Sequence, residues 1–174
     1  FRSSSNPNIL SGPHWLPDIL RAITILGDSK LLIVLVILVA AYLVVRRTYY
    51  FALALLAPTV GGMVIVSLLK DHFSRSRPEV VEHLTTQYSM SFPSGHAANS
   101  AIVYLTMAML FTQIRPERHA GIYLVSAALL LTATIGISRV ALGVHWPSDV
   151  VAGWMFGLSW GYFWVLLTTS FRKK

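Results

Sequence analysis

Cysteine is absent from the sequence, and charged residues are scarce. Without cysteine the chain forms neither disulfides nor thiolate sites, so its redox compartment is left open. Charged residues make up 12% of the 174 residues and hydrophobic residues 55%, whereas soluble domains carry about 25% charged residues. A chain of this length cannot bury so much apolar surface in a water-soluble core. The composition therefore predicts a protein that has a lipid bilayer as its solvent.

The sequence also lacks a signal peptide, an internal repeat and a low-complexity segment. A signal peptide would show a basic stretch, an apolar stretch and a cleavage site in turn. The first residue is Phe1 and not methionine, so we expect the original N-terminus to lie upstream of it. We expect one membrane-embedded domain over residues 1–174.

Long segments without charge are the main pattern that the sequence does contain. There are five: Leu31–Val45, Thr48–Leu69, Ala97–Ile114, Ala120–Ser138 and Val150–Phe171. Four of them reach the 18 or so residues expected of a spanning helix. Leu31–Val45 is shorter, but Lys30 and Arg46 at its ends can snorkel toward water. The pattern predicts an all-α, polytopic bundle of five spans, with a buried soluble helix as the alternative for Leu31–Val45.

The basic residues are concentrated between alternate spans. Seven of the fourteen Lys and Arg residues lie in short stretches after the first, third and fifth segments: Arg46, Arg47, Arg115, Arg118, Arg172, Lys173 and Lys174. The positive-inside rule predicts that these stretches face the cytoplasm. The net charge of +7 is then explained by topology, and we expect no nucleic-acid partner. The connections Lys70–Pro93 and Arg139–Asp149 are expected on the outer face.

Residues 15–26 are predicted to form a short helix in the outer interface. Pro17 suits a first helical position. Apolar residues line one side of this helix, and Trp15 is a candidate interface anchor. Such a helix either guides lipid toward the outer face or simply packs against the bundle, and the sequence favours neither.

Small residues recur in the last span at Gly153, Gly157 and Gly161. This spacing allows close approach of two helices. We expect packing within the chain and not dimerisation, so an oligomer is not required.

Three clusters of polar residues lie at the ends of spans, where ionisable groups are costly and therefore suggest function. They are Lys70–Pro78, Pro93–His96 and Ser138–Asp149. Because successive spans alternate in direction, all three clusters are expected at the outer face. The sequence thus predicts one site built from distant parts of the chain.

The residue types in these clusters suit phosphate chemistry. Lys70, Arg77 and Arg139 can neutralise the oxygens of a phosphoryl group. Ser94 is predicted to be the N-cap of the following helix, whose free N–H groups would bind an anion. Gly95 leaves room for a close approach.

The histidines supply the reactive groups. His145 and Asp149 are four residues apart, so a helix beginning near Pro147 lets the carboxylate reach the imidazole and fix its tautomer. His145 can then act as a nucleophile, with His96 as the proton donor to the leaving oxygen. A zinc site on these three residues is the alternative, but three nearby cations oppose a divalent metal. We expect neither a metal nor a cofactor.

The three clusters resemble the type 2 phosphatidic acid phosphatase superfamily, which shares its site with vanadium haloperoxidases. The likeness rests on eleven positions: Lys70, Arg77, Pro78, Pro93, Ser94, Gly95, His96, Ser138, Arg139, His145 and Asp149. It implies a six-helix membrane fold and metal-independent dephosphorylation through a phosphohistidine, so a first helix is expected to be missing before Phe1. The resemblance makes His145 the nucleophile, Asp149 its partner and His96 the general acid. It makes Lys70, Arg77, Ser94, Gly95 and Arg139 phosphate-binding residues.

Several functions remain open on this pattern. The leading one is hydrolysis of a lipid phosphate or lipid pyrophosphate, such as phosphatidate, phosphatidylglycerol phosphate, undecaprenyl pyrophosphate or a lipid A phosphate. The alternatives are a lipid phosphotransferase, a haloperoxidase and a non-catalytic lipid-binding protein. We expect a bacterial cytoplasmic membrane with the site on its outer side, and we expect Glu79–Phe92 to influence headgroup choice.

The remaining polar residues have simpler expected roles. His14, His72, His83 and His119 match none of the three clusters, and we expect them to be solvated loop residues. Arg75 is either a solvated charge or a further phosphate contact.

Overall fold

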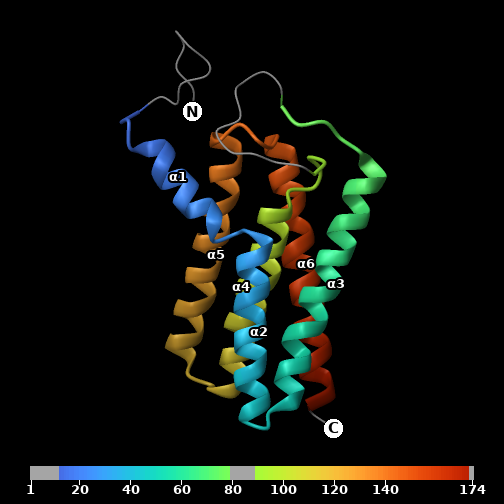
Figure 1. Ribbon diagram of the computed structural model, residues 1–174. Helices are drawn as coiled ribbons and strands as arrows, with labels where there is room; N and C mark the ends of the chain where they lie inside the picture. The colour runs from blue at the N-terminus through green and yellow to red at the C-terminus, as the bar shows by residue number, and fades with distance from the viewer. Residues whose placement is uncertain (1–11, 79–88, 173–174) are drawn as a thin grey trace.

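The computed structural model describes residues 12–78 and 89–172, and this part of the chain contains helices and no strands. The six helices are α1 (Leu16–Ile25), α2 (Ser29–Val45), α3 (Tyr49–Phe73), α4 (Gly95–Ile114), α5 (Arg118–Ala141) and α6 (Pro147–Arg172). Helices α2 to α6 run roughly side by side, and α1 leans away at one end (Figure 1). The predicted all-α bundle is confirmed.

Four of these helices are individually long and apolar enough to cross a membrane: α3, α4, α5 and α6. The 17 residues of α2 fall short, but α1 and α2 together meet the same test as a pair bent by 43°. By length and composition the described chain therefore has four spans, or five when α1 and α2 are counted as one bent span, and the predicted span at Leu31–Val45 corresponds to α2 in that pair. The separate helix predicted over residues 15–26 is present, and its place in the membrane interface stays a prediction.

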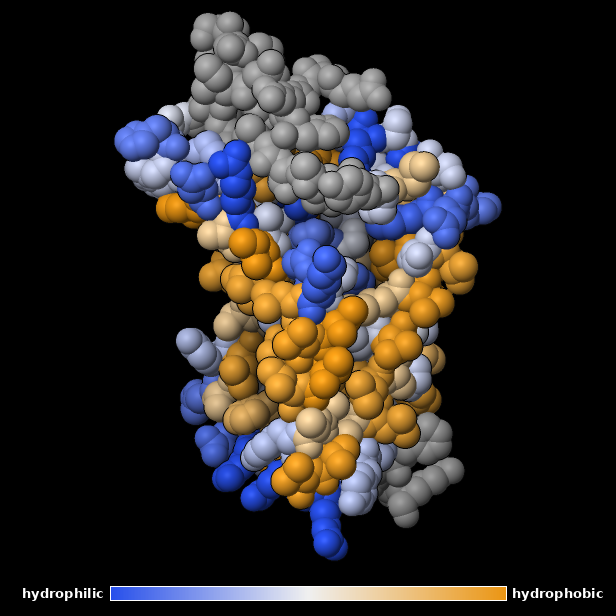
Figure 2. Space-filling model, viewed as in Figure 1, coloured by the Kyte–Doolittle hydropathy of each residue, from blue (hydrophilic) through white to orange (hydrophobic). Residues whose placement is uncertain are grey.

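The outward faces of the helices are apolar. Side chains that are more than half exposed include Leu38, Leu53, Leu68, Leu130 and Met155. Exposure of this many large apolar side chains to water would cost about 25 cal/mol per Å², whereas lipid tails solvate them. Figure 2 shows the resulting apolar band around the middle of the molecule, with hydrophilic atoms gathered toward its two ends. The protein is an integral-membrane protein.

The two ends of the bundle carry different connections (Figure 1). The connections from α3 to α4 and from α5 to α6 lie at one end, which we call the site end. The connections from α2 to α3 and from α4 to α5 lie at the opposite end, which we call the basic end because Arg46, Arg47, Arg115 and Arg118 are exposed there. All three polar clusters therefore belong to the site end, as the alternation of spans predicts.

Helix α4 is the centre of the bundle and contacts α2, α3, α5 and α6. Its buried residues are mostly small, and Ala97, Ala98 and Ala101 are wholly inaccessible. Without a hydrophobic driving force between helices in lipid, close packing of small residues has to hold them together. Helix α6 supplies the complementary surface through its glycines.

The glycine stripe of α6 packs against α4 within the chain. A Cβ atom at Gly153 would lie 2.7 Å from the Ser94 carbonyl oxygen, and one at Gly157 would lie 2.6 Å from the Ala98 carbonyl oxygen. A Cβ atom at Gly161 would meet nothing nearer than the Thr106 hydroxyl at 3.8 Å. The predicted intramolecular role is thus confirmed, and it is strict at the first two glycines only.

This difference between the glycines gives a stability test. We expect Gly157→Ala to lower the free energy of unfolding by about 1–3 kcal/mol, because the methyl group meets the backbone of α4 and forces the helices apart. The measurement is thermal unfolding of the purified protein in detergent. Gly161→Ala is the matched control and should be neutral or slightly stabilising, since alanine is the better helix former. Equal effects of the two substitutions would contradict the packing described here.

Candidate active site

A cavity of about 310 Å³ opens at the site end. Five of the eight predicted site residues line it: Lys70, Arg77, Gly95, His96 and His145. The other three, Ser94, Arg139 and Asp149, are buried and are not part of its lining. The remaining lining residues are Asp28, Ser29, Met63, Val66, Ser67, Ser89 and Asn99. The lining residues thus come from positions between Asp28 and His145, and the ends of the helices bring them together in one cavity.

The ends of four helices position these residues. Lys70 lies in the last turn of α3 and Arg139 in the last turn of α5, while His96 and Asp149 lie in the first turns of α4 and α6. Helix α3 ends at Ser74, whose left-handed backbone (φ 44°) breaks the helical path. Residues 75–78 then return across the mouth of the bundle.

His145 is held by Asp149 as the spacing predicts. Helix α6 begins at Pro147, and the Nδ1 atom of His145 lies 3.3 Å from Oδ2 of Asp149. The Trp146 backbone N–H donates to the same carboxylate oxygen at 3.0 Å. His145 is 3% exposed and Asp149 is wholly buried. Because an ionised carboxylate only accepts hydrogen bonds, Nδ1 carries the proton and Nε2 keeps its lone pair.

Two further residues bind Asp149, and the sequence did not identify either role. Ser91 donates its hydroxyl to Oδ2 at 2.5 Å. Arg75 donates to Oδ1 at 2.8 Å, and its guanidinium lies 5.5 Å from the centre of the Trp146 ring. Arg75 is therefore neither a purely solvated charge nor a free phosphate ligand, because it pairs with the buried carboxylate. Its position two residues before Arg77 is the only sequence signal for this role, and Ser91 has none.

The cations beside the cavity are held by backbone carbonyl groups. Arg77 donates to the carbonyl oxygens of Val144 at 2.6 Å and Ser89 at 2.9 Å. Its Nη1 atom also lies 3.3 Å from Nε2 of His145. Lys70 donates to the carbonyl oxygen of Met90 at 2.5 Å. These bonds fix two positive charges next to the unprotonated nitrogen of His145, so an anion that enters the cavity meets both.

The start of α4 forms the opposite wall of the site. Ser94 occupies the N-cap position but makes no side-chain capping bond, and its buried hydroxyl oxygen has no partner among the described residues. The helix begins directly after Ser94, as predicted. The prediction that the Ser94 hydroxyl caps this helix with a hydrogen bond is wrong. A Cβ atom at Gly95 would lie 3.6 Å from Lys70, so protein packing alone does not demand glycine. The first N–H groups of any helix lack helical partners, and here they adjoin the cavity.

Arg139 is the largest fully buried side chain among the described residues. One terminal nitrogen donates to the Thr24 hydroxyl of α1 at 3.1 Å. Its Nε and Nη2 atoms have no partner within the described part of the chain. Buried guanidinium groups are costly without partners, so Arg139 has unused capacity to bind an anion.

The break between α1 and α2 packs against His96. A Cβ atom at Gly27 would lie 3.3 Å from Cβ and Cδ2 of His96 and 2.5 Å from the Ile135 side chain. Only a residue without a side chain fits there. Asp28 and Ser29, directly after this break, line the cavity, so the bend supplies one wall of the site.

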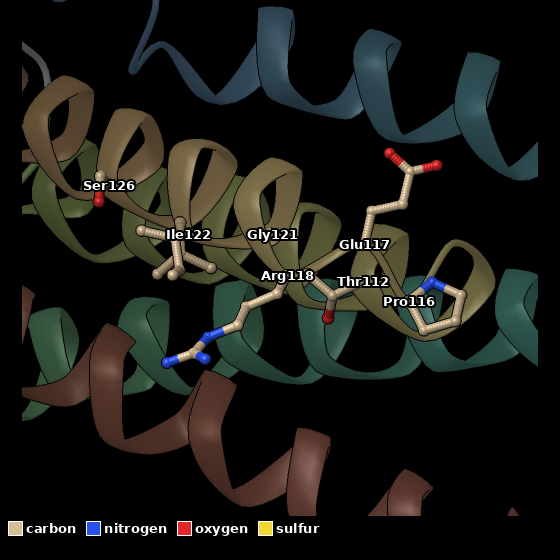
Figure 3. A pocket seen from close by; sticks show the side chains of 8 residues that line it. Thr112, Pro116, Glu117, Arg118, Gly121, Ile122 and Ser126 are labelled. Atoms are coloured by element: carbon tan, nitrogen blue, oxygen red, sulfur yellow. The ribbon is translucent and has the colours of Figure 1, made fainter.

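A larger cavity of about 530 Å³ lies at the basic end, far from these residues. Its lining comes from the end of α4, the start of α5 and their connection, and in Figure 3 the side chains of Glu117 and Arg118 point away from one another. It contains no histidine. The reactive groups are therefore confined to the smaller cavity.

The other histidines of the described chain lie apart from the site. His14, His72 and His119 are exposed, and His83 lies outside the described residues, as do Glu79 and Glu82. Within residues 12–78 and 89–172, no three His, Asp or Glu side chains are grouped so that they could hold a metal ion.

Burial lowers the pKa of the His145 imidazole to about 4, because low-dielectric surroundings disfavour its charged form. The hydrogen bond to Asp149 raises this pKa, and the charge of Arg77 lowers it again. Burial also lowers the pKa of Arg77, but a guanidinium stays charged at neutral pH. At pH 7 the site therefore combines a neutral imidazole with fixed positive charges.

Comparison with known proteins places this arrangement in a family. A family model described as the PAP2 superfamily matches residues 30–173. Phosphatidylglycerophosphatase B of Bacillus subtilis is 32% identical over 156 residues, which are 88% of this chain and 76% of that protein. The lipid A 1-phosphatase of Rhizobium etli is 30% identical, and the match covers 63% of this chain and 46% of that protein. The undecaprenyl-diphosphatase of Sulfolobus acidocaldarius is 33% identical, with 63% of this chain and 47% of that protein covered.

Solved structures agree with these relatives. The crystal structure of a transmembrane PAP2-type phosphatidylglycerolphosphate phosphatase from Bacillus subtilis has a TM-score of 0.83 at 30% identity and covers 94% of this chain and 79% of that chain. The crystal structure of Aquifex aeolicus LpxE has a TM-score of 0.68 at 25% identity, with 90% and 88% covered.

The protonation of His145 is open to direct measurement. We expect its ring to stay neutral until the pH falls to about 4, whereas an unperturbed histidine gains its proton near pH 6.5. Arg77→Gln should raise the pKa of His145 because a positive charge is lost, and Asp149→Asn should lower it because the accepting carboxylate is lost.

The measurement is an NMR titration of protein labelled with ¹³C-histidine, with the His145 signal identified by its absence from His145→Gln. His119, at the basic end, is the internal control because neither substitution touches it. Protonation of His145 near pH 6.5 in the unsubstituted protein would contradict the site described here.

Proposed function

Because this chain belongs to the PAP2 superfamily, we propose that it is an integral-membrane phosphatase that removes the terminal phosphate of a lipid phosphate or lipid pyrophosphate. The relatives at 30% identity or more include phosphatases named for phosphatidylglycerophosphate, lipid A 1-phosphate and undecaprenyl diphosphate. Their shared feature is a phosphate on an apolar body. A cavity at one end of a membrane bundle suits such a substrate.

One observation carries the proposal: His145 lines a cavity whose wall also includes two cations, and the Asp149 carboxylate lies at the Nδ1 side of its ring. Asp149 lies 3.3 Å from Nδ1 of the ring, and Nε2, which lies 3.3 Å from Nη1 of Arg77, is the proposed nucleophile. Lys70, Arg77 and His96 line the same cavity. A nucleophile, a cationic clamp and a second imidazole are the components that phosphoryl transfer through a histidine requires.

In the first step, Nε2 of His145 attacks the phosphorus atom. A P–N bond forms as the P–O bond to the leaving group breaks, and the leaving oxygen takes a proton from His96. The negative charge of a bound phosphate favours the protonated form of His96 in the complex. The carboxylate of Asp149 stabilises the imidazolium that develops on His145.

In the second step, water hydrolyses the phosphohistidine. His96, now neutral, takes a proton from the water as its oxygen attacks phosphorus. The P–N bond breaks, its electron pair returns to Nε2, and inorganic phosphate leaves. The enzyme is then restored, and no metal takes part in either step.

The positive charges around the phosphate supply most of the catalysis in this proposal. Phosphoryl transfer depends on positioning and on stabilisation of the equatorial oxygens. Lys70 and Arg77 border the cavity, and two nitrogens of Arg139 lack partners among the described residues. The Ser94 hydroxyl and the N–H groups at the start of α4 supply uncharged donors. We propose that these groups together bind the phosphate.

The arginines of the basic end support an orientation in the membrane. Arg46, Arg47, Arg115 and Arg118 are exposed in short connections there, and such residues favour the cytoplasmic side. The site end then faces outward, toward the periplasm or the exterior of a bacterial cell. The substrate would be a lipid of the outer leaflet.

Transfer of the phosphoryl group to another lipid is the competing reaction. The same phosphohistidine would form, and only the acceptor in the second step would differ. Appearance of inorganic phosphate in step with loss of substrate distinguishes hydrolysis from transfer.

Loss of the nucleophile is the direct test of the mechanism. We expect His145→Ala to abolish phosphate release from lipid phosphates and pyrophosphates in detergent, because the nucleophile of the proposed first step is lost. Unsubstituted protein should stay fully active in EDTA, and the variant should keep its helical content by circular dichroism. Full activity of the purified variant, or loss of activity in the chelator, would refute the mechanism.

The Asp149 carboxylate should matter through the tautomer of His145. We expect Asp149→Asn to reduce kcat by a factor on the order of 10⁴, by analogy with loss of the orienting carboxylate in a serine-protease triad. The measurement compares kcat and KM of the folded variant with those of the unsubstituted enzyme. A loss below tenfold would mean that Asp149 serves packing and not catalysis.

A further inference from the structure

One wall of the cavity is polar, and the proposed mechanism does not use it. It is formed by Asp28 and Ser29 at the start of α2 and by Asn99 of α4. Apolar side chains would be expected where only lipid tails pass. The polar character of this wall therefore points to a polar part of the ligand.

Asn99 is the central residue of this wall. It is 5% exposed, and its side-chain amide donates to the Ser29 hydroxyl at 3.2 Å. Its carbonyl oxygen Oδ1 has no partner among the described residues. A buried amide oxygen without a hydrogen bond costs about 1–3 kcal/mol, and a hydrogen-bond donor in the cavity would remove this cost.

The Asn99–Ser29 pair adjoins the proposed phosphate site. A Cβ atom at Gly95 would lie 3.6 Å from Cε of Lys70 and 4.0 Å from the amide nitrogen of Asn99. Asn99 is also one helical turn after Gly95 on α4, so the two residues share a face. A ligand with its phosphate at Lys70 and Gly95 would therefore bring its next few atoms to Asn99.

The chemistry of the pair selects a hydroxyl group. Because Asn99 already donates to the oxygen of Ser29, the Ser29 O–H is free to donate and Oδ1 is free to accept. A hydroxyl can satisfy both atoms at once, since it donates one hydrogen bond and accepts others. A second phosphate group fits less well, because the Asp28 carboxylate, which caps α2 through the Lys30 N–H at 2.8 Å, lies on the same wall.

We propose, on the basis of the proposed function, that Asn99 and Ser29 form a hydroxyl-binding subsite for the leaving alcohol of the substrate. The preferred class is a lipid phosphate in which the carbon next to the phosphorylated carbon carries a free hydroxyl. The substrate hydroxyl would supply the hydrogen bond that Oδ1 of Asn99 lacks among the described residues. A substrate without that hydroxyl leaves Oδ1 unpaired.

A matched pair of lipids tests the proposal without any change to the protein. The first is 1-palmitoyl-2-hydroxy-glycerol-3-phosphate, and the second is the same lipid without its 2-hydroxyl group. We expect kcat/KM for phosphate release to be about tenfold higher for the first lipid, the value of one buried hydrogen bond. Equal values would overturn the proposal.

Substitution of Asn99 then tests whether the preference for the lipid with the hydroxyl arises at the Asn99–Ser29 subsite. Asn99→Leu, which replaces the amide by an apolar group of similar size, should bring the ratio of the two kcat/KM values close to one. The kcat/KM for the lipid that lacks the hydroxyl should rise, because binding of this lipid no longer leaves a buried amide oxygen unpaired. If Asn99→Leu does not fold, Ser29→Ala at the half-buried start of α2 makes the same test, and retention of the tenfold ratio in the folded variant would overturn the proposal.

Thr106→Val is the matched control for the loss of a buried polar group. Thr106 lies on the same helix, is 1% exposed, and has a hydroxyl without a partner among the described residues, but it does not line the cavity. This variant should keep the tenfold ratio, and its loss would show that the preference does not arise at Asn99. If neither these two lipids nor a lipid pyrophosphate releases phosphate, the proposed phosphatase function fails; if both lipids release phosphate equally, only the hydroxyl subsite fails.

Discussion

The buried carboxylate of Asp149 is the interaction on which the site depends. It accepts hydrogen bonds from the Trp146 N–H, the Ser91 hydroxyl and the Arg75 guanidinium, and it lies 3.3 Å from the His145 ring. A charge without solvent exposure is tolerated only when it is fully paired, and removal of one partner from such a pair typically costs about 3–5 kcal/mol. Asp149 lies in the first turn of α6, and its hydrogen bonds tie this helix to Arg75, which follows α3, and to Ser91, which precedes α4. The orientation of the His145 ring follows from this junction.

The bilayer imposes the second constraint. Lipid tails compete with side chains for apolar contacts, so the helices are held together by close packing of small residues. Gly153 and Gly157 of α6 let it approach the backbone of α4, and α4 in turn carries Gly95, His96 and Asn99 into the cavity. The geometry of the cavity is thus linked to the packing of the central helix. A shift of α4 against α6 would move Gly95 and His96 relative to His145.

The bend between α1 and α2 packs against the candidate site. Arg139 of α5 is bonded to Thr24 of α1, and Gly27 packs against His96. The residues after the bend, Asp28 and Ser29, form the wall that we propose reads the leaving alcohol. In this view the phosphate is bound by cations at one side of the cavity, while the identity of the lipid is recognised at the other side.

The sequence by itself determined the helical spans, their alternation and the gathering of the three polar clusters at one end, because hydrophobic length and charge placement are local properties. The spacing of His145 and Asp149 also predicted their contact, since both lie within one turn of the start of α6. The tertiary structure decided what depends on distant contacts. It pairs Arg75 and Ser91 with Asp149, leaves the Ser94 hydroxyl without a capping bond, and packs Gly27, at the break between α1 and α2, against His96. It also brings Asn99 and Ser29 together, 70 residues apart, and no local pattern encodes such a pair because its partners lie on different helices.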